Sequence, residues 1–310
     1  MGVRFTLRQL EYLVAVGEAG SIAIAAERVG VSSPSISVAI GQIEKQLGLV
    51  LFVRRHAQGV SLTQSGRQII EQARVILAEA ERMSEIAGTI SGVVRGTLHV
   101  GCLLTFAQVV LPRLRRGFVE AHPEVIFRQS EGHQDALFEA LRQAEIDIAL
   151  TYDLDIPDDL VFQPLASLPP HVVLPADHPL AERDGLTLQD LAAFPMVLLD
   201  LPHSAEYFLS GFREAGLRPL IAERTADIQV LRSLVANGFG YSIANLRPRS
   251  DRSPDGLLLK IVPLFQGLRP MRLGLLQAEG AGQVQTIRAF AAHVETNLAA
   301  ILSGASSKDG

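Results

Sequence analysis

Apolar residues recur at helical spacing in three short runs within the first 48 residues, and glycines separate the runs. The first run ends at Gly20, and Ser21 is a suitable N-cap for the second, which ends at Gly30. The third begins near Pro34, a residue favoured in the first turn of a helix. The buried faces predicted for these helices are Leu10, Leu13, Val14 and Gly17; Ile22, Ala25, Ala26 and Val29; and Ile36, Ile40, Ile43 and Leu47. Two short helices joined by a tight turn form a helix-turn-helix, whose second helix enters the major groove of DNA.

The outward face of residues 34–47 fits such a recognition helix. An exposed valine at Val38 packs well on a thymine methyl group, and Gly41 permits close approach to the sugar-phosphate backbone. Hydroxyl and amide groups on this face can bind base edges or phosphates, and Lys45 suits a phosphate. The alternative interpretation is a solvated helix in a generic bundle.

The next stretch, residues 47–66, predicts a short hairpin. VLFVRR and GVSLT have strand character, and HAQG forms the turn between them. Arginines at the base of such a wing can reach the phosphates or the minor groove beside the recognition helix. The predicted DNA-binding residues are therefore Ser33, Pro34, Ser35, Ser37, Val38, Gln42, Lys45, Arg54 and Arg55.

The run LRQLEYLVAVGEAGSIAIAAERVGVSSPSIS, followed by IEKQLGLVLFVRR and LTQSG, resembles the N-terminal winged helix-turn-helix of LysR-type transcriptional regulators. The resemblance covers about 60 residues and implies a regulator that binds duplex promoter or operator DNA under the control of a small-molecule effector. Ser33 is a departure, because that family usually has a base-contacting glutamine before the proline. The shorter serine reaches the backbone more readily than a base. We expect residues 1–62 to form the DNA-binding domain.

From Gln64 onward about 25 residues without proline predict a long helix. Its apolar residues are spaced four and three apart in a heptad pattern, which favours pairing with a second copy of the chain. The pattern comprises Ile69, Ala73, Ile76, Ala80, Met83 and Ala87. The alternative is that this stripe packs on its own domain. The resemblance implies homodimers that assemble into tetramers, with residues 63–92 as linker helix and hinge.

After residue 96 strands and helices alternate, which predicts two α/β halves with parallel sheets. Segments near 165–173 and 262–270 would cross between the halves. This order predicts a two-lobed effector domain of the periplasmic-binding-protein type over residues 93–310, as the LysR family has. Lobe 1 would span about 93–165 and 270–303, and lobe 2 about 166–269.

Ligands of open α/β sheets bind beyond the carboxyl ends of the strands, so the effector is expected between the lobes. Cys102, Leu103, Leu104 and Thr105 follow the first strand, and Thr105 at a helix start favours an anionic group. The resemblance adds His133, Pro202, His203, Ser204 and the 226–228 turn with Asp227. Each residue also has an ordinary interpretation: Thr105 as a plain N-cap, His133 as a surface cap, His203 as a loop residue. Asn245 stands where the family usually has proline, and its amide would bind a ligand or close a turn.

Composition and charge reduce the number of function classes to which the chain can belong. The net charge is −5, yet residues 1–70 carry seven Lys and Arg against four Glu, a net +3 that leaves −8 on the remainder. A basic head on an acidic body is typical of a small nucleic-acid module attached to another domain. No apolar run approaches a membrane span and no secretory signal is apparent, so we expect a cytoplasmic protein. The missing signal also argues against a free solute-binding module.

Cys102 is the single cysteine, which rules out an intramolecular disulfide. Because some LysR proteins sense oxidants through cysteines, modification of this one thiol remains an alternative. Hydrolase, zinc-protease and phosphate-loop motifs are absent, and we expect no enzyme activity, cofactor or metal. Asp147 and Asp153 flank one predicted strand, a placement that we attribute to solvent exposure.

Overall fold

A computed structural model describes residues 5–55, 59–91 and 93–303 of the chain. The chain divides into two compact units, residues 1–96 with 142–145, and residues 97–141 with 146–310. Each unit is built around its own apolar core. No helix within the described ranges combines the length and apolar character needed to cross a bilayer.

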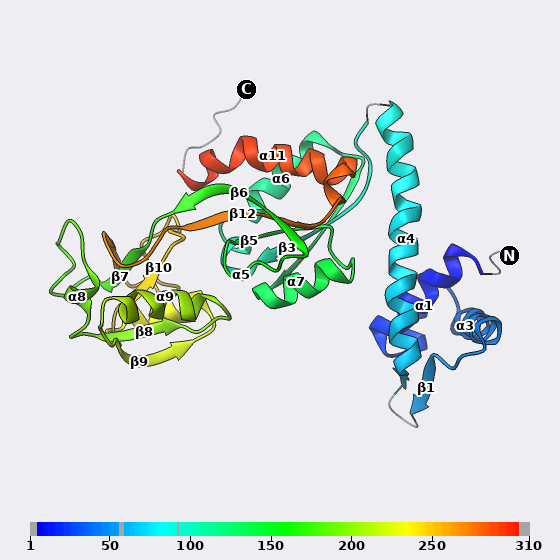
Figure 1. Cartoon of the computed structure of the whole chain (residues 1–310), viewed down its shortest axis with the longest axis horizontal. Helices are drawn as coiled ribbons and strands as arrows, with labels where there is room; N and C mark the ends of the chain where they lie inside the picture. The colour runs from blue at the N-terminus through cyan, green and yellow to red at the C-terminus, as the bar shows by residue number, and fades with distance from the viewer. Residues whose placement is uncertain (1–4, 56–58, 92, 304–310) are drawn as a thin grey trace. The chain divides into compact units, whose positions relative to one another are not determined.

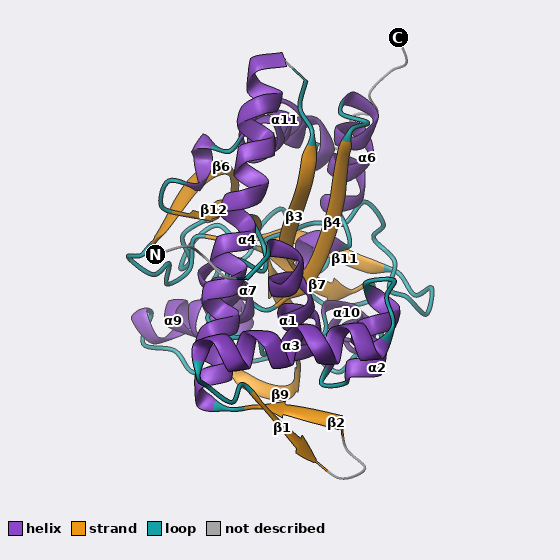
Figure 2. Cartoon of the chain, turned by 90° about the vertical axis from the view of Figure 1, so that its right-hand side faces the viewer, coloured by secondary structure: helices purple, strands orange, loops and turns teal. Residues whose placement is uncertain are grey.

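The first unit is a three-helix head with a wing and a long helix (Figures 1 and 2). Gly20, with φ 60°, ends the first helix, and Ser32 caps the third through its side chain. The predicted helix-turn-helix and the two paired strands of the predicted hairpin are therefore present, whereas residues 56–58 of the predicted turn lie outside the described residues. The elements are α1 (Leu7–Ala19), α2 (Ile22–Arg28), α3 (Ser33–Leu47), β1 (Phe52–Arg55), β2 (Gly59–Leu62) and α4 (Gln64–Ser91).

Close backbone contacts hold the wing against the head. Gly59, with φ 86°, lies so near α1 that a Cβ there would be 2.3 Å from the carbonyl oxygen of Gly20. That carbonyl accepts a 2.9 Å hydrogen bond from Val60. On the other strand, Oε1 of Glu44 accepts hydrogen bonds of 2.7 and 3.2 Å from the amides of Leu51 and Phe52. These bonds fix the position of β1 relative to α3.

The core of the head accounts for most of the predicted apolar stripe on α3. Ile36, Ile40 and Ile43 are buried, but Leu47 is exposed, so the prediction is wrong at this last position. Leu47 occupies the final helical turn, and Gly48 then takes the left-handed conformation and ends the helix.

The heptad stripe on α4 is divided between two environments. Ala73 is buried in the core of the head, and Ile69 and Ile76 pack against that core. Ala73 therefore packs on its own unit, which is the alternative interpretation of the stripe, whereas pairing of the stripe with a second chain stays a prediction. Met83 lies beyond the head and is 73% exposed. The side chain of Ala87 lies outside the described residues.

The second unit begins with lobe 1, a five-stranded sheet in the order β4-β3-β5-β12-β6. Helices α6 and α11 lie on one side of this sheet and α7 on the other (Figure 1). Phe118 of α6 packs edge-on against Phe290 of α11, with ring centroids 5.2 Å apart. The elements are β3 (Gly96–Leu103), α5 (Leu104–Ala107), α6 (Leu111–Ala121), β4 (Val125–Gly132), α7 (Gln134–Arg142), β5 (Ile148–Tyr152), β6 (Leu160–Leu168), β12 (Met271–Ala278), η1 (Ala281–Gln283) and α11 (Gln285–Leu302).

Lobe 2 has a three-stranded sheet, β10-β7-β11, and a parallel pair, β8 and β9, joined by the bridge between Met196 and Tyr241. Its elements are β7 (His171–Pro175), α8 (Leu188–Leu191), β8 (Pro195–Leu199), α9 (Ser204–Glu214), β9 (Leu220–Thr225), α10 (Ile228–Ala236), β10 (Ser242–Ala244) and β11 (Leu259–Pro263). Two crossover segments, 168–171 and 264–270, connect the lobes. The two predicted crossings are thus present.

Two details of the predicted α/β order are wrong. The sheets are mixed, because β12 runs antiparallel to both β5 and β6, and β7 runs antiparallel to β10 and β11. β6 leads from lobe 1 to lobe 2 and β12 leads back, so the two strands run in opposite directions where they pair. The predicted single helix after β3 is instead interrupted by a turn at residues 108–110 between α5 and α6.

Candidate functional site

The outward face of α3 is open, as a DNA-reading helix requires. Val38 is 60% exposed, and nothing lies within 4 Å of the position that a Cβ would occupy at Gly41. Pro34, Ser35, Gln42 and Lys45 are exposed as well, whereas Ser33 and Ser37 are half-buried. Apolar, hydroxyl, amide and basic groups therefore lie together on one accessible surface.

Two of these polar groups already have partners within the head. Nε2 of Gln9 donates a 2.7 Å hydrogen bond to Oε1 of Gln42, and the hydroxyls of Ser32 and Ser35 lie 2.8 Å apart. Both contacts are on exposed surface, so DNA can replace them at small cost. Arg54 and Arg55 lie on β1 of the wing, but their side chains are outside the described residues.

In lobe 1 the predicted effector residues that follow β3 are mostly covered. Cys102 and Leu103 are buried, Leu104 is half-buried, and Thr105 is 9% exposed. Thr105 lies within the four-residue helix α5, for which Leu103 is the N-cap. His133 is half-buried at the start of α7, and its Nδ1 has no hydrogen-bond partner among the described residues.

His203 of lobe 2 contacts two aspartates of lobe 1. From the start of α9 its Nε2 lies 2.7 Å from a carboxylate oxygen of Asp135 on α7, and its Nδ1 lies 2.7 Å from Asp155. Burial alone lowers the pKa of His203, but the hydrogen bonds and charges of the two aspartates outweigh it and raise the pKa. The ring therefore favours the imidazolium form, with both N–H groups donating to carboxylates. Pro202 beside it is exposed and Ser204 is buried.

The backbone at this contact adopts an uncommon conformation. His203 has φ 61° and ψ −40°, and the amide of Ser204 donates a 2.7 Å hydrogen bond to the carbonyl of Pro202, which closes a γ-turn. Asp155, one of the two partners, also has a positive φ, of 43°. A non-glycine residue at positive φ is strained by about 1–3 kcal/mol, and such residues concentrate at ligand clamps and switch regions.

A second polar contact joins the lobes near the 226–228 turn. Nε2 of Gln229 on α10 donates a 2.6 Å hydrogen bond to Oε1 of Gln108 in the turn between α5 and α6. Asp227 caps α10, since its Oδ1 accepts hydrogen bonds from the amides of Gln229 and Val230. The side chain of Asp227 thus fixes the helix start that presents Gln229 to lobe 1.

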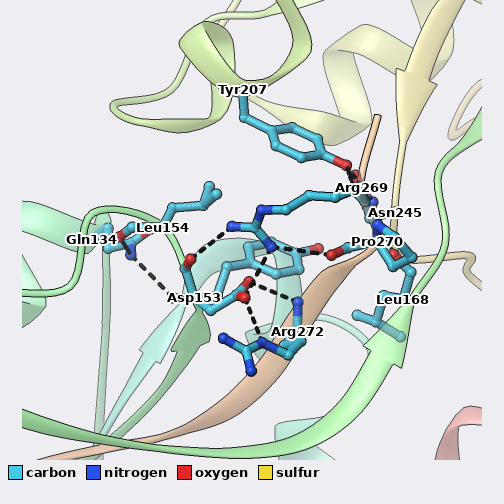
Figure 3. A network of polar contacts seen from close by, with 10 residues as sticks. Gln134, Asp153, Leu154, Leu168, Tyr207, Asn245, Arg269, Pro270 and Arg272 are labelled. Carbon is cyan, nitrogen blue, oxygen red and sulfur yellow. Dashed lines mark hydrogen bonds and ion pairs between the residues drawn. The ribbon is translucent and has the colours of Figure 1, made fainter. Parts of the chain in front are cut away.

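Asn245 belongs to a polar network at the crossovers (Figure 3). Its Nδ2 donates to the carbonyl of Leu168 at 2.9 Å and to the hydroxyl of Tyr207 at 3.2 Å. Tyr207 in turn donates a 2.5 Å hydrogen bond to the carbonyl of Arg269. The amide therefore ties the end of β10 to both crossover segments.

Asp153 anchors the lobe 1 side of the same network. Its side chain is only 5% exposed, and Arg269 and Arg272 form ion pairs with it at 2.9 and 2.6 Å. Burial alone raises the pKa of Asp153. The hydrogen bonds with Arg272 and Arg269 have a larger effect in the opposite direction, so the pKa lies below its usual value. The guanidinium of Arg269 also lies 6.0 Å from the ring centre of Tyr207. Lobe 1 and lobe 2 are thereby coupled through one arginine.

The sequence interpretation missed this network because it attributed both flanking aspartates to solvent exposure. That interpretation is wrong for Asp153, and also for Asp147, which accepts a 2.7 Å hydrogen bond from the amide of His99. Burial raises the pKa of Asp147. The signal available in the sequence was their position directly at the two ends of an entirely buried strand, β5.

Two family matches bear on both sites. Residues 7–67 match the bacterial regulatory helix-turn-helix protein of the lysR family, and residues 91–299 match the LysR substrate binding domain. The chain belongs to the LysR family of transcriptional regulators. The matched ranges contain α3 with its open face and both lobes with the His203 contact.

Individual LysR-family relatives extend over most of the chain. The HTH-type transcriptional regulator YvbU of Bacillus subtilis is 30% identical over 238 residues, 77% of this chain and 80% of YvbU. The crystal structure of the PA01 protein of Pseudomonas aeruginosa is 33% identical, with a TM-score of 0.65, and covers 96% of this chain and 100% of that one. The crystal structure of full-length CbnR complexed with its target DNA is 25% identical, with a TM-score of 0.67, and covers 94% and 99%.

Cys102 differs from a redox-sensing thiol of a LysR-type regulator. It is fully buried rather than placed at an open mouth of the lobes, and burial raises the pKa of the thiol well above its usual range. Oxidation proceeds through an accessible thiolate. The environment of Cys102 therefore disfavours direct modification.

Proposed function

We propose that this LysR-family regulator binds duplex DNA through α3 and the wing, and that a small molecule bound between the lobes changes this binding. The open face of α3 is the observation that carries the first part. Val38 is placed to contact a thymine methyl, Ser35 and Gln42 to bind base edges, and Lys45 to bind a phosphate. The DNA complex of CbnR supports this use of the fold.

For the chain as a whole we propose three functional segments: a DNA-binding domain at 1–62, a linker at 63–92, and an effector domain at 93–310. We also propose dimerisation through the exposed side of α4, where Val75 and Met83 are exposed apolar residues. Two heads together supply the contact area that one small module lacks. The protein would act in the cytoplasm and without catalysing a reaction.

For the effector we propose a polar or anionic organic molecule bound between the lobes. Thr105, His133 and His203 are the groups that we assign to it, with Ser204 and Asp227 supporting the loops. The paired contacts of His203 support this assignment, because a ligand that enters between the lobes beside His203 must displace or extend them. His203 as an imidazolium would attract an anionic group.

The direct test is a thermal-shift screen of metabolites on the full chain, followed by gel shifts with upstream DNA. A ligand present at 100 times its dissociation constant adds about 2.7 kcal/mol of stability to the unit that it binds. Thr105→Val should lower the affinity for the selected ligand by roughly 10- to 100-fold, and should leave the affinity for DNA in the absence of ligand unchanged. Val38→Ala is the matched control, because it should alter DNA preference and leave ligand binding intact. Unchanged ligand affinity in Thr105→Val would place the effector elsewhere.

A further inference from the structure

A series of hydrogen bonds leads from the backbone at the start of α1 to the exposed face of α3. Thr6 is the N-cap of α1, and its backbone amide donates a 2.9 Å hydrogen bond to Oε1 of Gln9. Nε2 of Gln9 in turn donates a 2.7 Å hydrogen bond to Oε1 of Gln42, 33 positions further along the chain. Gln9 is half-buried and Gln42 is exposed, so the series runs from the body of the head to its surface.

These bonds determine the orientation of both side-chain amides. A backbone N–H can only donate, so the atom of Gln9 that accepts from Thr6 must be the oxygen. The other end of the Gln9 amide is then the NH2 group, which also can only donate, and its partner on Gln42 must be the oxygen. The NH2 group of Gln42 remains, and it has no hydrogen-bond partner within residues 5–55, 59–91 and 93–303.

Gln42 lies on the outward face of α3 together with Val38 and Lys45. DNA can bind this face without breaking the bond from Gln9, because the NH2 group of Gln42 still has both N–H donors available. The end of the amide that lies away from Gln9 is therefore a donor. In the major groove guanine presents the acceptors O6 and N7, whereas cytosine presents the N4 donor group. An amide held in this orientation matches guanine and opposes cytosine.

We propose that Gln9 is a positioning residue for DNA recognition, which holds the amide of Gln42 so that its NH2 group reads a guanine in each half-site. This inference rests on the proposed function, because it requires that α3 lies in the major groove. Gln9 acts through Gln42 and touches no base. Specificity at this base pair is thereby set in part by a residue of α1, outside the recognition helix.

The test selects binding sites for the full chain from a library of DNA duplexes with a randomised segment. Wild type should favour guanine over cytosine at one position of each half-site by about 2- to 10-fold, the effect of one hydrogen bond. Gln9→Glu keeps the acceptor for Thr6 but replaces the donor to Gln42 by a second acceptor. The Gln42 amide should then turn over, present its oxygen to DNA and favour cytosine. Gln9→Met, which holds neither end of the amide, should abolish the preference.

Two controls separate this role from helix capping and from charge. Thr6→Ala removes the hydroxyl that caps α1 but keeps the backbone amide that holds Gln9, so the base preference should not change. Leu7→Glu adds the same charge at an exposed position of the same turn, and should weaken binding to all sequences by a similar factor. In a Gln42→Met background, Gln9→Glu should no longer alter the preference, because the amide through which it acts is gone.

An unchanged guanine preference in Gln9→Glu would overturn the inference. A loss of affinity that is the same for all sequences would also overturn it, because the Gln42 amide would then face a phosphate. So would an effect of Gln9→Glu that persists in the Gln42→Met background. Val38→Ala distinguishes these results from failure of the proposed function: if it alters the sequence selected by wild type, only the role of Gln9 is wrong. If wild type selects no sequence, the use of α3 in DNA recognition is wrong as well.

Discussion

His203 makes two opposing contributions to the contact between the lobes: its hydrogen bonds stabilise the contact, and its strained backbone destabilises it. Two substitutions at this position separate them. His203→Ala removes both hydrogen bonds to Asp135 and Asp155 and keeps a side chain at a positive φ of 61°. His203→Gly removes the same bonds and also relieves the backbone strain, because glycine adopts positive φ without a steric penalty. The difference between the variants therefore isolates the strain.

The exposure of the three side chains sets the strength of the two hydrogen bonds. The His203 side chain is 21% exposed, but the carboxylates of Asp135 and Asp155 are 63% and 73% exposed, so solvent screens the pairs. Each bond is then worth about 0.2–1 kcal/mol, the range of surface ion pairs. Relief of strain returns about 1–3 kcal/mol. We expect His203→Ala to loosen the contact and His203→Gly to match or exceed the wild type.

The contact also depends on pH. An unfolded histidine has a pKa of about 6.5, and the pKa of His203 in the folded protein is raised. The stabilisation is therefore fully present below about pH 6.5 and is lost as the pH rises through the raised folded value. His178 is a control of opposite sign, because burial lowers its pKa. Its contribution is fully present above about pH 6.5 and is lost as the pH falls through the lowered folded value.

Hydrogen exchange at the first turn of α9 measures this opening locally. After correction for intrinsic exchange, protection of Ser204–Phe208 should fall about 2- to 30-fold in His203→Ala at pH 6, and less at pH 8.5. His203→Gly should restore it. Equal losses in the two variants would refute the strain, and a loss independent of pH would refute the protonated contact.

Three further predictions concern the crossover network, the linker and the DNA-binding face. Asp153→Asn should destabilise the two-lobed unit by about 1.5–3 kcal/mol in thermal melts at pH 7, and the exposed Asp158→Asn is the control. Because the pKa of Asp153 is lowered in the folded protein, this difference should begin to shrink below about pH 3.9 and vanish once the pH has fallen through the lowered folded value. Ala73→Glu should unfold the head by circular dichroism, whereas Met83→Glu should weaken the dimer in sedimentation and leave the head folded; a stable Ala73→Glu head would contradict the observed packing. Lys45→Ala should weaken binding to all DNA sequences by a similar factor, and should lower the slope of log affinity against log salt concentration by about 0.9. An unchanged slope would show that Lys45 contacts no phosphate.

The head could be predicted from sequence because its signals are local. Gly20, Ser32 and Pro34 mark helix ends within a few residues of the helices that they bound, and the apolar spacing defines each buried face. The same kind of pattern did not predict the environment of Ala73 on α4, since a heptad stripe indicates an apolar face but not the surface against which this face packs. Ala73 packs in the core of its own head together with residues of α1.

Much of the second unit depends on contacts between residues far apart in the chain. His203 was selected as an effector residue, but its partners lie 48 and 68 positions away, and no local pattern identifies them. The partners of Asp153 lie 116 and 119 positions away. The direction of β12 was missed for the same reason, because this strand follows the whole of lobe 2 in the sequence but pairs with β5 and β6 of lobe 1.

Footprinting of upstream DNA, with and without a ligand selected by the thermal-shift screen, tests whether a ligand between the lobes changes DNA binding by the heads. A dimer with two α3 helices predicts two protected half-sites, spaced by about 10–10.5 base pairs or a multiple of it. We expect the ligand to alter this footprint, and Val38→Ala to abolish discrimination at one base pair in each half-site. Absence of any sequence-specific protection, or a footprint that stays the same when a ligand saturates the two-lobed unit, would contradict the proposed function.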